Sequence, residues 1–594
     1  MRIPLILAAS TLFLVPSLHA TEVSSEINAV ENGLRGAVQF AGDKPWNINE
    51  RMQHYGVPGV SIAVIKDFKI HWVKHYGVTD KETAKKVGSQ TLFQAGSISK
   101  PVAAYGALKL VEENKLSLDR PVNEKLKGWK IPDNEFTKKQ PVALKHLLNH
   151  SAGLTVHGFP GYSSGERVPS INQILDGEKP ANTAAIRVDM QPETKFRYSG
   201  GGYTVIQKLV SDVTENSFPK AMDELVLLPL GMQQSTYQQP LPAEKLKYAA
   251  AGYLPNKLPV AGKHHIYPEM AAAGLWTTAE DLAKFSIDVQ LAVKADKSAV
   301  LSESMVNKML TPFVSDNAGL GFFIQQGKEN DYFSHAGWDE GFSADLVAHK
   351  TNGQGVVIMT NSNHPAFINE LKNSVATVYQ WGDFLQPDLT ALPISQSEQK
   401  RIVGRYKYDV DMMFNIFAEN NRIFMQYLDA EKMEVFRIGD NQYIRREHAM
   451  KFRFEKLAGD NSVNLVFGIN NEMEHVRRRL TENEVLPFEY IVGGNYEKAE
   501  PLYVALLKDV PEYKSHAESV LLGYADKMYA TNKKSQALEV YLMATRLFST
   551  ARSFVKLASY YKKSNDKKSA IASLKKAQQI DPEDPVVIKS LNGI

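Results

Sequence analysis

The chain has 594 residues, of which 43 % are hydrophobic, 10 % aromatic and 23 % charged, a composition typical of a globular protein with more than one domain. Its 69 basic and 66 acidic residues leave a net charge of +3, which gives no reason to expect nucleic acid or an anionic membrane as the main partner. The absence of cysteine excludes thiol nucleophiles, thiolate metal sites, iron–sulfur clusters, disulfides and a lipid anchor on cysteine.

The first twenty residues have the pattern of a secretory signal peptide. Arg2 provides a positive charge, the stretch from Ile3 to Leu18 is mostly apolar, and Ala20 is a small residue suited to a cleavage site. We therefore expect residues 1–20 to be removed and the mature protein to be exported, to the periplasm or outside the cell. The alternative is an uncleaved anchor helix, against which the short apolar run argues. No later segment is apolar over the roughly 18 residues that a spanning helix needs, so no transmembrane anchor is expected.

Residues 21–386 are expected to form a mixed α/β domain around one antiparallel sheet. Strand patterns occur near both ends of this region, at residues 60–65, 70–73, 320–324, 342–348 and 356–360. The chain between them is mainly helical from about residue 98 to 285, and a helix over residues 366–381 closes the domain. This order indicates that the sheet joins the two ends of the domain and that the helical region is inserted between them.

A polar segment with two prolines, residues 387–399, is predicted to be a linker. After it, apolar residues alternate on both sides of Asn420-Asn421, which predicts a β-hairpin because asparagine accepts a positive φ at a tight turn. The alternation continues to Phe467, so residues 398–482 are expected to form a small all-β module. The alternative is that these strands extend the first domain.

Residues 486–594 are expected to form helical repeats. Three similar stretches surround Ala499, Ala537 and Ala570, which recur at close to the ~34-residue period of tetratricopeptide repeats. Stacked helix pairs of this kind usually present a concave surface to another chain, so a protein partner is expected to bind here. The alternative is an unrelated helical tail.

The sharpest chemical signal is Gly96-Ser97-Ile98-Ser99-Lys100, which lies between a strand-like stretch and a predicted helix. Residues three apart on a helix share a face, with Cβ atoms about 5–6 Å apart, so Ser97 and Lys100 can touch. Serine becomes a nucleophile when a neighbour takes its proton, and a buried lysine beside positive charge can be that neighbour. The other interpretation is a capping serine followed by a surface lysine.

Two further motifs follow in the chain. Tyr198 stands in Phe196-Arg197-Tyr198-Ser199-Gly200, at a glycine-rich turn before a helix, where its phenol could relay a proton to a leaving group. His335 stands in Ser334-His335-Ala336-Gly337-Trp338, before the strand at 342–348, where small residues would let a substrate lie along a strand edge. Taken alone, the first is equally a packing tyrosine and the second more often an ordinary loop histidine.

In this order the three motifs resemble the S-x-x-K, Y-x-N and K/H-T/S-G motifs of the serine β-lactamase and penicillin-binding-protein superfamily. The most similar branch contains class C β-lactamases, D,D-peptidases, D-aminopeptidases and esterases. The resemblance covers about residues 27–385 and is supported by the flanking stretches 146–154, 229–232 and 273–282. It implies a serine β-lactamase-like α/β (α+β) catalytic domain with an antiparallel sheet and a helical insert, which the β module and the α-helical repeats would follow.

The resemblance also implies roles for individual residues. Ser97 would be acylated, Lys100 and Tyr198 would be the acid–base pair, and His335 would assist proton transfer or bind substrate. The backbone N–H groups of Ser97 and Trp338 would form the oxyanion hole, where preorganised donors stabilise the developing charge. Gly337 and Gly200 would complete the substrate site; no metal and no cofactor are expected.

Three departures from the family pattern concern the substrate. Gly200 stands where the second motif usually has asparagine, Ala336 where the third has a hydroxyl residue, and His335 where the third often has lysine. The sequence therefore predicts an exported serine hydrolase of the β-lactamase, D,D-peptidase and esterase type that acts on a small ester, amide or D-amino-acid peptide. The alternative is a catalytically weak protein of the same fold that binds a cell-wall fragment or a partner.

Two other patterns are given no catalytic role. Residues 161–165 match G-x-S-x-G, the nucleophile elbow of α/β-hydrolases, but their flanks indicate a loop where that elbow needs a strand before it and a helix after it. The pair His264-His265 could suggest a metal site, but a surface loop is the simpler interpretation.

Overall fold

The computed structural model describes residues 16–592, apart from residues 386, 387, 447, 458, 460, 461 and 469–474. Most of the predicted signal peptide, residues 1–15, lies outside this range. The described chain forms two compact units: the first contains the residues before Ala37 and those from Lys44 to Leu385, and the second contains Ala37–Asp43 and the residues from Asp388 onward.

The first unit is built on a six-stranded antiparallel sheet in the order β2-β1-β8-β7-β6-β5. The strands are β1 (Gly59–Lys66), β2 (Lys69–Gly77), β5 (Phe323–Gln326), β6 (Asp331–Asp339), β7 (Phe342–His349) and β8 (Gly355–Thr360). A separate two-stranded pair joins β3 (Phe93–Gln94) to β4 (Trp276–Thr277). The pairing of β1 with β8 confirms the expectation that one sheet joins the two ends of the domain.

The strand β6 is the main difference from the sequence-based expectation, which placed the His335 motif before a strand rather than inside one. The strand predicted at residues 320–324 also begins later, at Phe323, because the residues before it form a tight turn in which Gly321 has a φ of 107°. Since β5 is short, it pairs only with the Asp331–Ser334 part of β6. Residues His335–Asp339 of β6 therefore pair with β7 on one side and leave their other edge open to the site described below.

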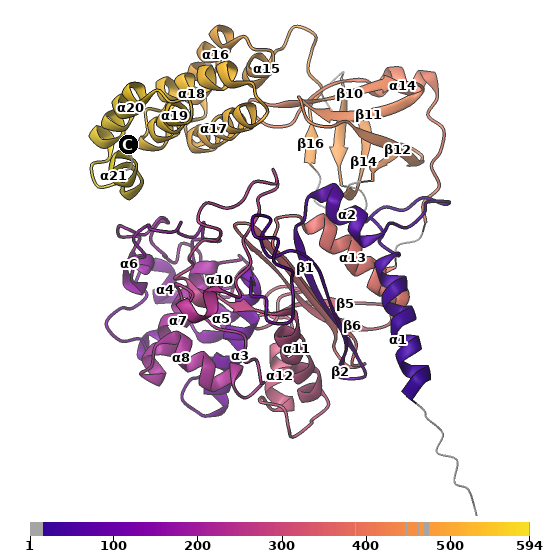
Figure 1. The fold of residues 1–594 in the computed structure, drawn as a ribbon, viewed down its shortest axis with the longest axis vertical. Coiled ribbons are helices and arrows are strands. Elements are labelled where there is room, and N and C mark those ends of the chain that lie inside the picture. Colours follow the sequence, from indigo (N-terminus) through magenta and orange to yellow (C-terminus); the bar gives the residue numbers. More distant parts are fainter. Residues whose placement is uncertain are drawn as a thin grey trace, which may run out of the picture. The chain divides into compact units, whose positions relative to one another are not determined.

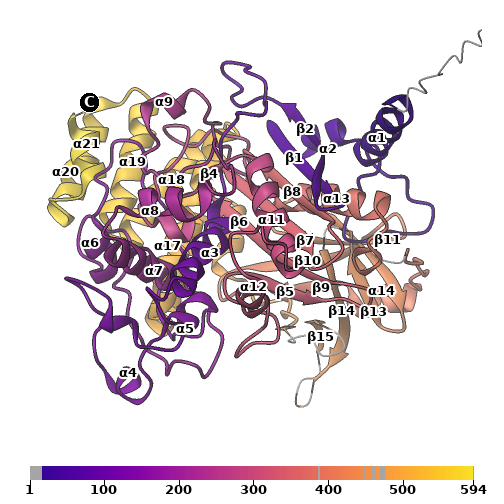
Figure 2. The same cartoon turned by 90° about the horizontal axis from the view of Figure 1, so that it is seen from below.

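Helices cover both faces of this sheet (Figures 1 and 2). On one face, α11 (Ala279–Val293) packs on β1 and β8 beside the inserted helices, and on the other face lie α1 (Pro16–Glu31), α2 (Ile48–Tyr55) and α13 (Pro365–Val378). Alternate residues of β1 enter the two cores, with Ala63 in the first and Ile62 in the second. The apolar faces of these helices and both faces of β1 are thus buried, as expected for a sheet covered on two sides.

The inserted region is mainly helical, as predicted. Its two central helices are α3 (Ser99–Glu112) and α7 (Gly200–Thr214), both of which are buried over most of their length. The shorter helices of this region are α4 (Glu135–Lys139), α5 (Leu144–Leu148), α6 (Ile171–Asp176), α8 (Phe218–Met222), α9 (Ala243–Leu246) and α10 (Met270–Ala273), and α12 (Glu303–Met309) follows it and packs on α11.

The second unit begins with an all-β module, an antiparallel meander of eight strands in chain order. The strands are β9 (Gly404–Lys407), β10 (Met413–Glu419), β11 (Arg422–Tyr427), β12 (Met433–Gly439), β13 (Gln442–Arg445), β14 (His448–Lys456), β15 (Val463–Phe467) and β16 (His475–Arg477). Backbone hydrogen bonds between Lys407 and Arg478 and between Leu480 and Arg405, each 2.8 Å, bring the ends of the meander together into a barrel-like form. Asn420 and Asn421 have φ values of 50° and 60°, which confirms the predicted turn.

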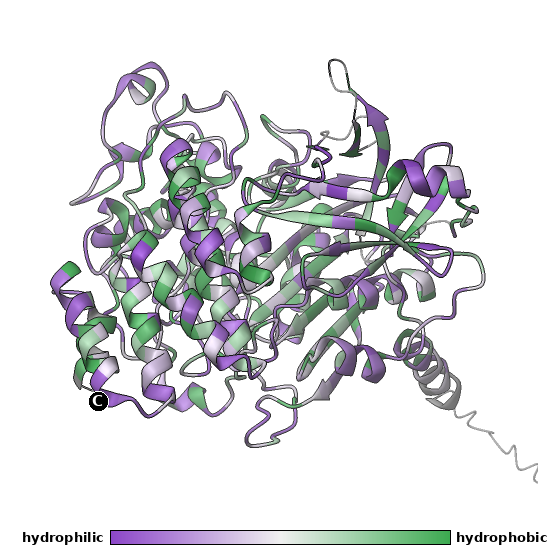
Figure 3. Cartoon of the chain, turned by 90° about the horizontal axis from the view of Figure 1, so that it is seen from above, coloured by the Kyte–Doolittle hydropathy of each residue, from purple (hydrophilic) through white to green (hydrophobic). Residues whose placement is uncertain are grey.

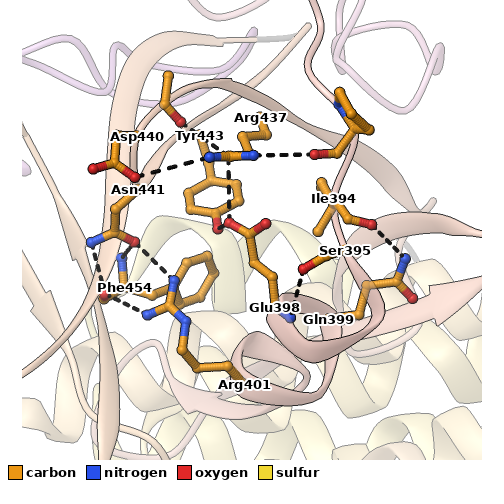
Figure 4. A network of polar contacts seen from close by, with 12 residues as sticks. Ile394, Ser395, Glu398, Gln399, Arg401, Arg437, Asp440, Asn441, Tyr443 and Phe454 are labelled. Carbon is orange, nitrogen blue, oxygen red and sulfur yellow. Dashed lines mark hydrogen bonds and ion pairs between the residues drawn. The ribbon is translucent and has the colours of Figure 1, made fainter.

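The barrel core is apolar, and a helix that begins in the segment predicted to be a linker contributes Ile402 to this core. This helix, α14 (Gln396–Ile402), lies against the barrel through the polar network shown in Figure 4. Glu398 accepts a hydrogen bond from the Tyr443 hydroxyl and faces Arg437, and Arg401 donates to the Asn441 side chain at 3.0 Å. The segment Ala37–Asp43 also joins this unit, because Val38 and Phe40 are buried against barrel residues.

The rest of the second unit is helical, which confirms the expectation of a C-terminal helical region. Its helices are α15 (Pro487–Val492), α16 (Tyr496–Asp509), α17 (Lys514–Ala530), α18 (Lys534–Phe548), α19 (Ala551–Lys563), α20 (Lys567–Ile580) and α21 (Pro585–Asn592). Figure 3 shows hydrophobic and hydrophilic residues alternating around these helices, as amphipathic helices in a stack require. The buried Asp411 of the barrel joins the two parts by accepting hydrogen bonds of 2.7 Å from Tyr503 and Tyr513.

None of the described helices is long and apolar enough to cross a membrane.

Candidate active site

Ser97 lies in a single 3-10 turn, Gly96–Ile98, between β3 and α3. Gly96 adopts a left-handed conformation with a φ of 52°, and a Cβ atom there would lie 2.4 Å from the backbone nitrogen of Trp338. A Cβ atom at Gly337 would lie 1.9 Å from the carbonyl oxygen of Ala95. Glycine at both positions therefore lets the turn that carries Ser97 lie directly against the open edge of β6, which no residue with a side chain would allow.

Lys100 lies in the first turn of α3 and is 2 % exposed. Its Nζ donates hydrogen bonds to Ser97 Oγ at 2.9 Å and to the carbonyl oxygen of Ala272 at 2.8 Å. The same nitrogen lies over the ring of Tyr198, 4.9 Å from its centroid. The structure thus brings together the three residues that the first two motifs predict, with the serine–lysine contact at proton-transfer distance.

Tyr198 precedes α7, and its ring is held among other aromatic rings. The ring of His150 lies 4.2 Å from it and that of His157 lies 4.9 Å from it, both measured between centroids. The buried His150 accepts a hydrogen bond from the Ser199 backbone at its Nδ1, and burial together with the nearby Lys100 side chain holds its pKa well below the ordinary value. A neutral His150 therefore supports one face of the predicted proton relay.

His335 is buried in β6, near Tyr198 and Phe323. Burial and the nearby Lys100 lower its pKa to about 3, so the imidazole is neutral at physiological pH. Its Nδ1 lies 2.7 Å from the carbonyl oxygen of Ala336, which fixes the proton on Nδ1 because a carbonyl can only accept. Nε2 then carries the lone pair, and it has no hydrogen-bond partner among the described residues.

A cavity of about 670 Å³ opens beside Ser97 and follows the open edge of β6 onto the α13 side of the sheet. Ser97, Tyr198, Gly337 and Trp338 line it, and Trp338 is 53 % exposed. Other lining residues come from β5, β7 and α13, among them Phe323, Asp345, Asn369 and Lys372. Lys100, His335 and Gly200 lie outside this set of lining residues.

The sequence analysis missed several polar groups near the site, because they stand in apolar or loop-like stretches with no motif. His157 lines the cavity beside Tyr198. Glu269, in the turn before α10, is 0 % exposed, and burial raises its pKa to about 8. Asp339, at the end of β6, accepts a hydrogen bond from the Gly96 backbone, and burial raises its pKa well above the ordinary value.

The two patterns that received no catalytic role meet in the structure. Ser163 Oγ lies 3.3 Å from His265 Nε2, and His265 Nδ1 lies 2.9 Å from the carbonyl oxygen of Pro160. Ser163 stands in a loop, as predicted, and not in a turn between a strand and a helix. Within the described part of the chain, no group of three or more histidine, aspartate and glutamate residues is placed to hold a metal ion.

Comparisons with known proteins show which family the chain resembles. The Beta-lactamase family profile matches residues 47–378, more than half of the chain. Protein flp of Staphylococcus aureus (strain COL) is 25 % identical over 339 residues, which are 55 % of this chain and 65 % of that protein. Penicillin-binding protein 4 of Amycolatopsis lactamdurans is 29 % identical over 201 residues, 34 % of this chain and 49 % of that protein. The chain thus spans less than two thirds of the length of these relatives.

Solved structures with a similar fold include the octameric penicillin-binding protein homologue from Pyrococcus abyssi, at 23 % identity and a TM-score of 0.48, which covers 73 % of this chain and 98 % of that one. The D-amino acid amidase from Ochrobactrum anthropi has 20 % identity and a TM-score of 0.48, over 60 % of this chain and 99 % of that one. The profile match over residues 47–378 identifies the chain as a member of the Beta-lactamase family.

Proposed function

We propose that the protein is an exported serine hydrolase that forms an acyl-enzyme through Ser97 on a small ester, amide or D-amino-acid peptide. The observation that carries this proposal is the hydrogen bond of 2.9 Å between Lys100 Nζ and Ser97 Oγ, beside a cavity that Ser97 lines. The family supports hydrolytic chemistry in general, and the narrower choice of substrate follows from the departures at Gly200 and Ala336.

The proposed reaction has two balanced halves. Ser97 Oγ attacks the substrate carbonyl while its proton passes to Lys100 Nζ, which acts as the general base. The bond to the leaving group then breaks, and the leaving alcohol or amine takes up a proton through Tyr198, which lies against Lys100. Water attacks the acyl-enzyme with the same groups in reverse order, which releases the acid and returns the proton to Ser97.

The negative charge that develops on the carbonyl oxygen needs donors that are already in place. Backbone N–H groups of Ser97 and Trp338 are the proposed donors, because Gly96 lies against the Trp338 backbone and Gly337 against the Ala95 backbone. A neutral His335 would assist through its unprotonated Nε2, which is buried close to Tyr198. Its position behind the cavity wall gives it a supporting role in this scheme.

We also propose roles for the other parts of the chain from their sequence patterns. Residues 1–20 would direct export, and the catalytic domain would extend over residues 21–386. The barrel module at 398–482 and the helices at 486–594 would serve recognition, with the helices as tetratricopeptide-like repeats that bind a protein partner. Helices stacked in pairs, such as α17 with α18 and α19 with α20, support this last proposal.

Labelling with a fluorescent fluorophosphonate tests the proposed chemistry, because this probe reacts with activated serines. The wild-type protein should be labelled and the Ser97→Ala variant should not. Ser163→Ala is the matched control, since Ser163 also lies near a histidine but stands outside the proposed site. Undiminished labelling of Ser97→Ala, or loss of labelling only in Ser163→Ala, would contradict the proposal.

A further inference from the structure

We propose that one edge of the C-terminal helical region binds the surface of a bilayer that contains anionic phospholipids. Residues 531–580 contain eleven basic residues and two acidic ones, although the net charge of the whole chain is only +3. The small total hides a strongly positive region, so the expectation that an anionic membrane is not the main partner does not apply to this part of the chain. Binding of this kind is independent of the chemistry proposed at Ser97.

Six exposed lysines stand on two turns of the same form and on the helix ends beside them. The turn between α17 and α18 contains Asn532, with a φ of 65°, and the turn between α19 and α20 contains Asn565, with a φ of 61°. In each turn the next backbone N–H donates a bond of 2.9 Å to the carbonyl oxygen five residues earlier, at Met528 or at Tyr561. The six residues, which we call the lysine edge, are Lys533, Lys534, Lys562, Lys563, Lys567 and Lys568.

Tyr529, near the end of α17, shows that the two turns lie next to each other. The Nζ atoms of Lys534 and Lys563 lie 5.7 and 5.3 Å from the centroid of its ring, so one lysine from each turn reaches the same tyrosine. The Tyr529 ring also lies 5.5 Å from that of Tyr560, measured between centroids. These contacts join the start of α18 to the end of α19 within the stack of helices in Figure 1, so the lysines share one edge of it.

The positive charge at these turns opposes the helices that begin there. Lys534 lies in the first turn of α18, and Lys567 and Lys568 lie in the first turn of α20, where the helix dipole favours an acidic residue. Helix α16 follows a turn of the same form, yet it begins with Tyr496 and Glu497 where α20 begins with two lysines. The fold therefore does not require lysine at these positions, which indicates a role in binding.

Most of this positive charge is not neutralised within the protein. In the part of the chain that the structure describes, no ion pair is formed by Lys533, Lys534, Lys563, Lys567 or Lys568. By contrast, Lys556 in the middle of α19 pairs with Asp526 at 2.7 Å. The carboxylate of Asp566, beside the edge, accepts a bond of 3.0 Å from the Ser569 backbone and caps α20. The lysine edge thus offers its charge to an external anion.

A bilayer surface fits this arrangement better than a nucleic acid does. Lysine is a point charge that pairs with phosphate without a fixed geometry, whereas nucleic acids are more often bound by arginine. The two arginines of residues 531–580 instead bond to Glu500 and Ser519. A flat surface can reach the ends of neighbouring helix pairs at the same time, and clusters of about 4–8 basic residues are typical of anionic lipid binding. The half-buried rings of Tyr529 and Tyr561 beside the lysines suit the boundary between headgroups and water.

Co-sedimentation with lipid vesicles tests this proposal. The protein from Thr21 onward is used, so that the apolar residues of the predicted signal peptide do not bind lipid. It should bind vesicles of phosphatidylglycerol and phosphatidylcholine in about a 3:7 ratio at low salt, bind phosphatidylcholine alone at least about 100-fold more weakly, and dissociate as salt rises. Binding to the anionic vesicles should weaken about 100-fold in the variant that combines Lys534→Gln, Lys563→Gln, Lys567→Gln and Lys568→Gln.

Three other variants keep the test specific to charge at this edge. Arginine at the same four positions keeps the charge and should bind within about threefold of wild type. A variant that loses the same charge from exposed lysines of the first unit should also bind within about threefold of wild type. It combines Lys125→Gln, Lys130→Gln, Lys138→Gln and Lys297→Gln. Ser97→Ala should bind as wild type does, which separates this test from the proposed acylation.

Several results would overturn the proposal. Equal binding to phosphatidylcholine alone, no binding at low salt, or equal losses in the two glutamine variants would each do so. Loss of binding in the arginine variant would show that packing around Tyr529, and not charge, is responsible. Displacement of the protein from the vesicles by duplex DNA or poly-L-glutamate, at an equal concentration of negative charge, would show that the partner is a soluble polyanion instead of a bilayer.

Discussion

Gly337 and Ala95 are in backbone contact so close that a methyl group on Gly337 would lie 1.9 Å from the Ala95 carbonyl oxygen. The two residues are far apart in the sequence, and each stands within two positions of a proposed oxyanion donor. The geometry of the candidate site is therefore set by the packing of one turn on one strand edge. This contact explains why the third motif has glycine at position 337, whether or not that residue also contacts substrate.

This contact makes Gly337→Ala a sharp test. The added methyl group must displace the turn that carries Ser97, so we expect fluorophosphonate labelling of Ser97 to fall at least 100-fold, since misplacement by about 1 Å suffices for such losses. Overpacking should also lower the free energy of unfolding by about 1–3 kcal/mol. Gly88→Ala, at a position where a Cβ atom meets no atom within 4 Å, is the control for both measurements. Normal labelling of Gly337→Ala would show that the contact does not set the site.

The parts of this structure that sequence predicts are those with a local signal. Strand-like apolar runs predict β1 and β2, alternation predicts the barrel hairpin, and the serine–lysine spacing predicts a contact that the structure shows at 2.9 Å. The strand β6 gives no such signal, because Ala336 and Gly337 have low strand propensity and the strand is held by its pairing with β7. The position of β6 in the site therefore depends on contacts with residues that are distant in the sequence.

The same reason explains the residues that the sequence analysis missed. Glu269 stands in a sequence that could equally be the exposed start of a helix, and only the tertiary fold shows that it is buried. His157 lies in a loop with no periodic pattern, and its place in the cavity follows from its bonds to α7. The segment Ala37–Asp43 joins the second unit although it lies inside the sequence of the first, which no local pattern indicates.

The Ser97–Lys100 contact predicts how labelling changes when either residue is replaced. Lys100→Ala should abolish labelling as completely as Ser97→Ala, because a nucleophile and its base act as one unit and their effects do not add. Lys100→Arg should be equally inactive, since a guanidinium does not give up its proton at any pH of the assay. Tyr198→Phe should be severe but should leave measurable labelling. A Lys100→Ala protein within about tenfold of wild type would show that Lys100 is not the base.

The departures at positions 200 and 336 predict a substrate preference. Esters or D-aminoacyl amides should be hydrolysed faster than β-lactams, because two polar contacts worth roughly 1 kcal/mol each are replaced by Gly200 and Ala336. Initial rates with a panel of short esters, D-amino-acid amides, muropeptides and the chromogenic β-lactam nitrocefin measure this order. Efficient turnover of nitrocefin by the purified protein would reverse it.

The buried Glu269 predicts a pH dependence of stability. Its pKa is about 8 in the folded protein, against an ordinary value of 4.5, because burial disfavours the charged form. As pH rises from about 4.5, the unfolded chain therefore loses this proton before the folded one does, and stability is lost progressively up to about pH 8. Glu269→Gln should remove the effect and should gain in Tm relative to wild type as pH rises from 5 to 8.

The control for this measurement is Glu178→Gln, which changes an exposed glutamate in the same unit. Its difference in Tm from wild type should stay constant across the same range. If Glu269→Gln behaves in the same way as Glu178→Gln, the carboxyl group is not held protonated in the folded protein.

The last prediction concerns the chain after Leu385. All the proposed catalytic residues lie before residue 340, and the sheet that positions them is complete at Thr360, so a protein that ends at Leu385 should still be labelled at Ser97 to within about threefold of the full chain. The solubility of the truncated protein is a separate prediction. Val38 and Phe40 are buried against Ile444, Phe436 and Leu389, and truncation would expose them to solvent. Newly exposed apolar residues of this kind promote association. The truncated protein should therefore aggregate, and the double substitution Val38→Ser and Phe40→Ser should keep it monomeric in size-exclusion chromatography while labelling persists. A truncated double variant that is monomeric and folded by circular dichroism, yet fails to label, would show that the second unit is needed for the chemistry.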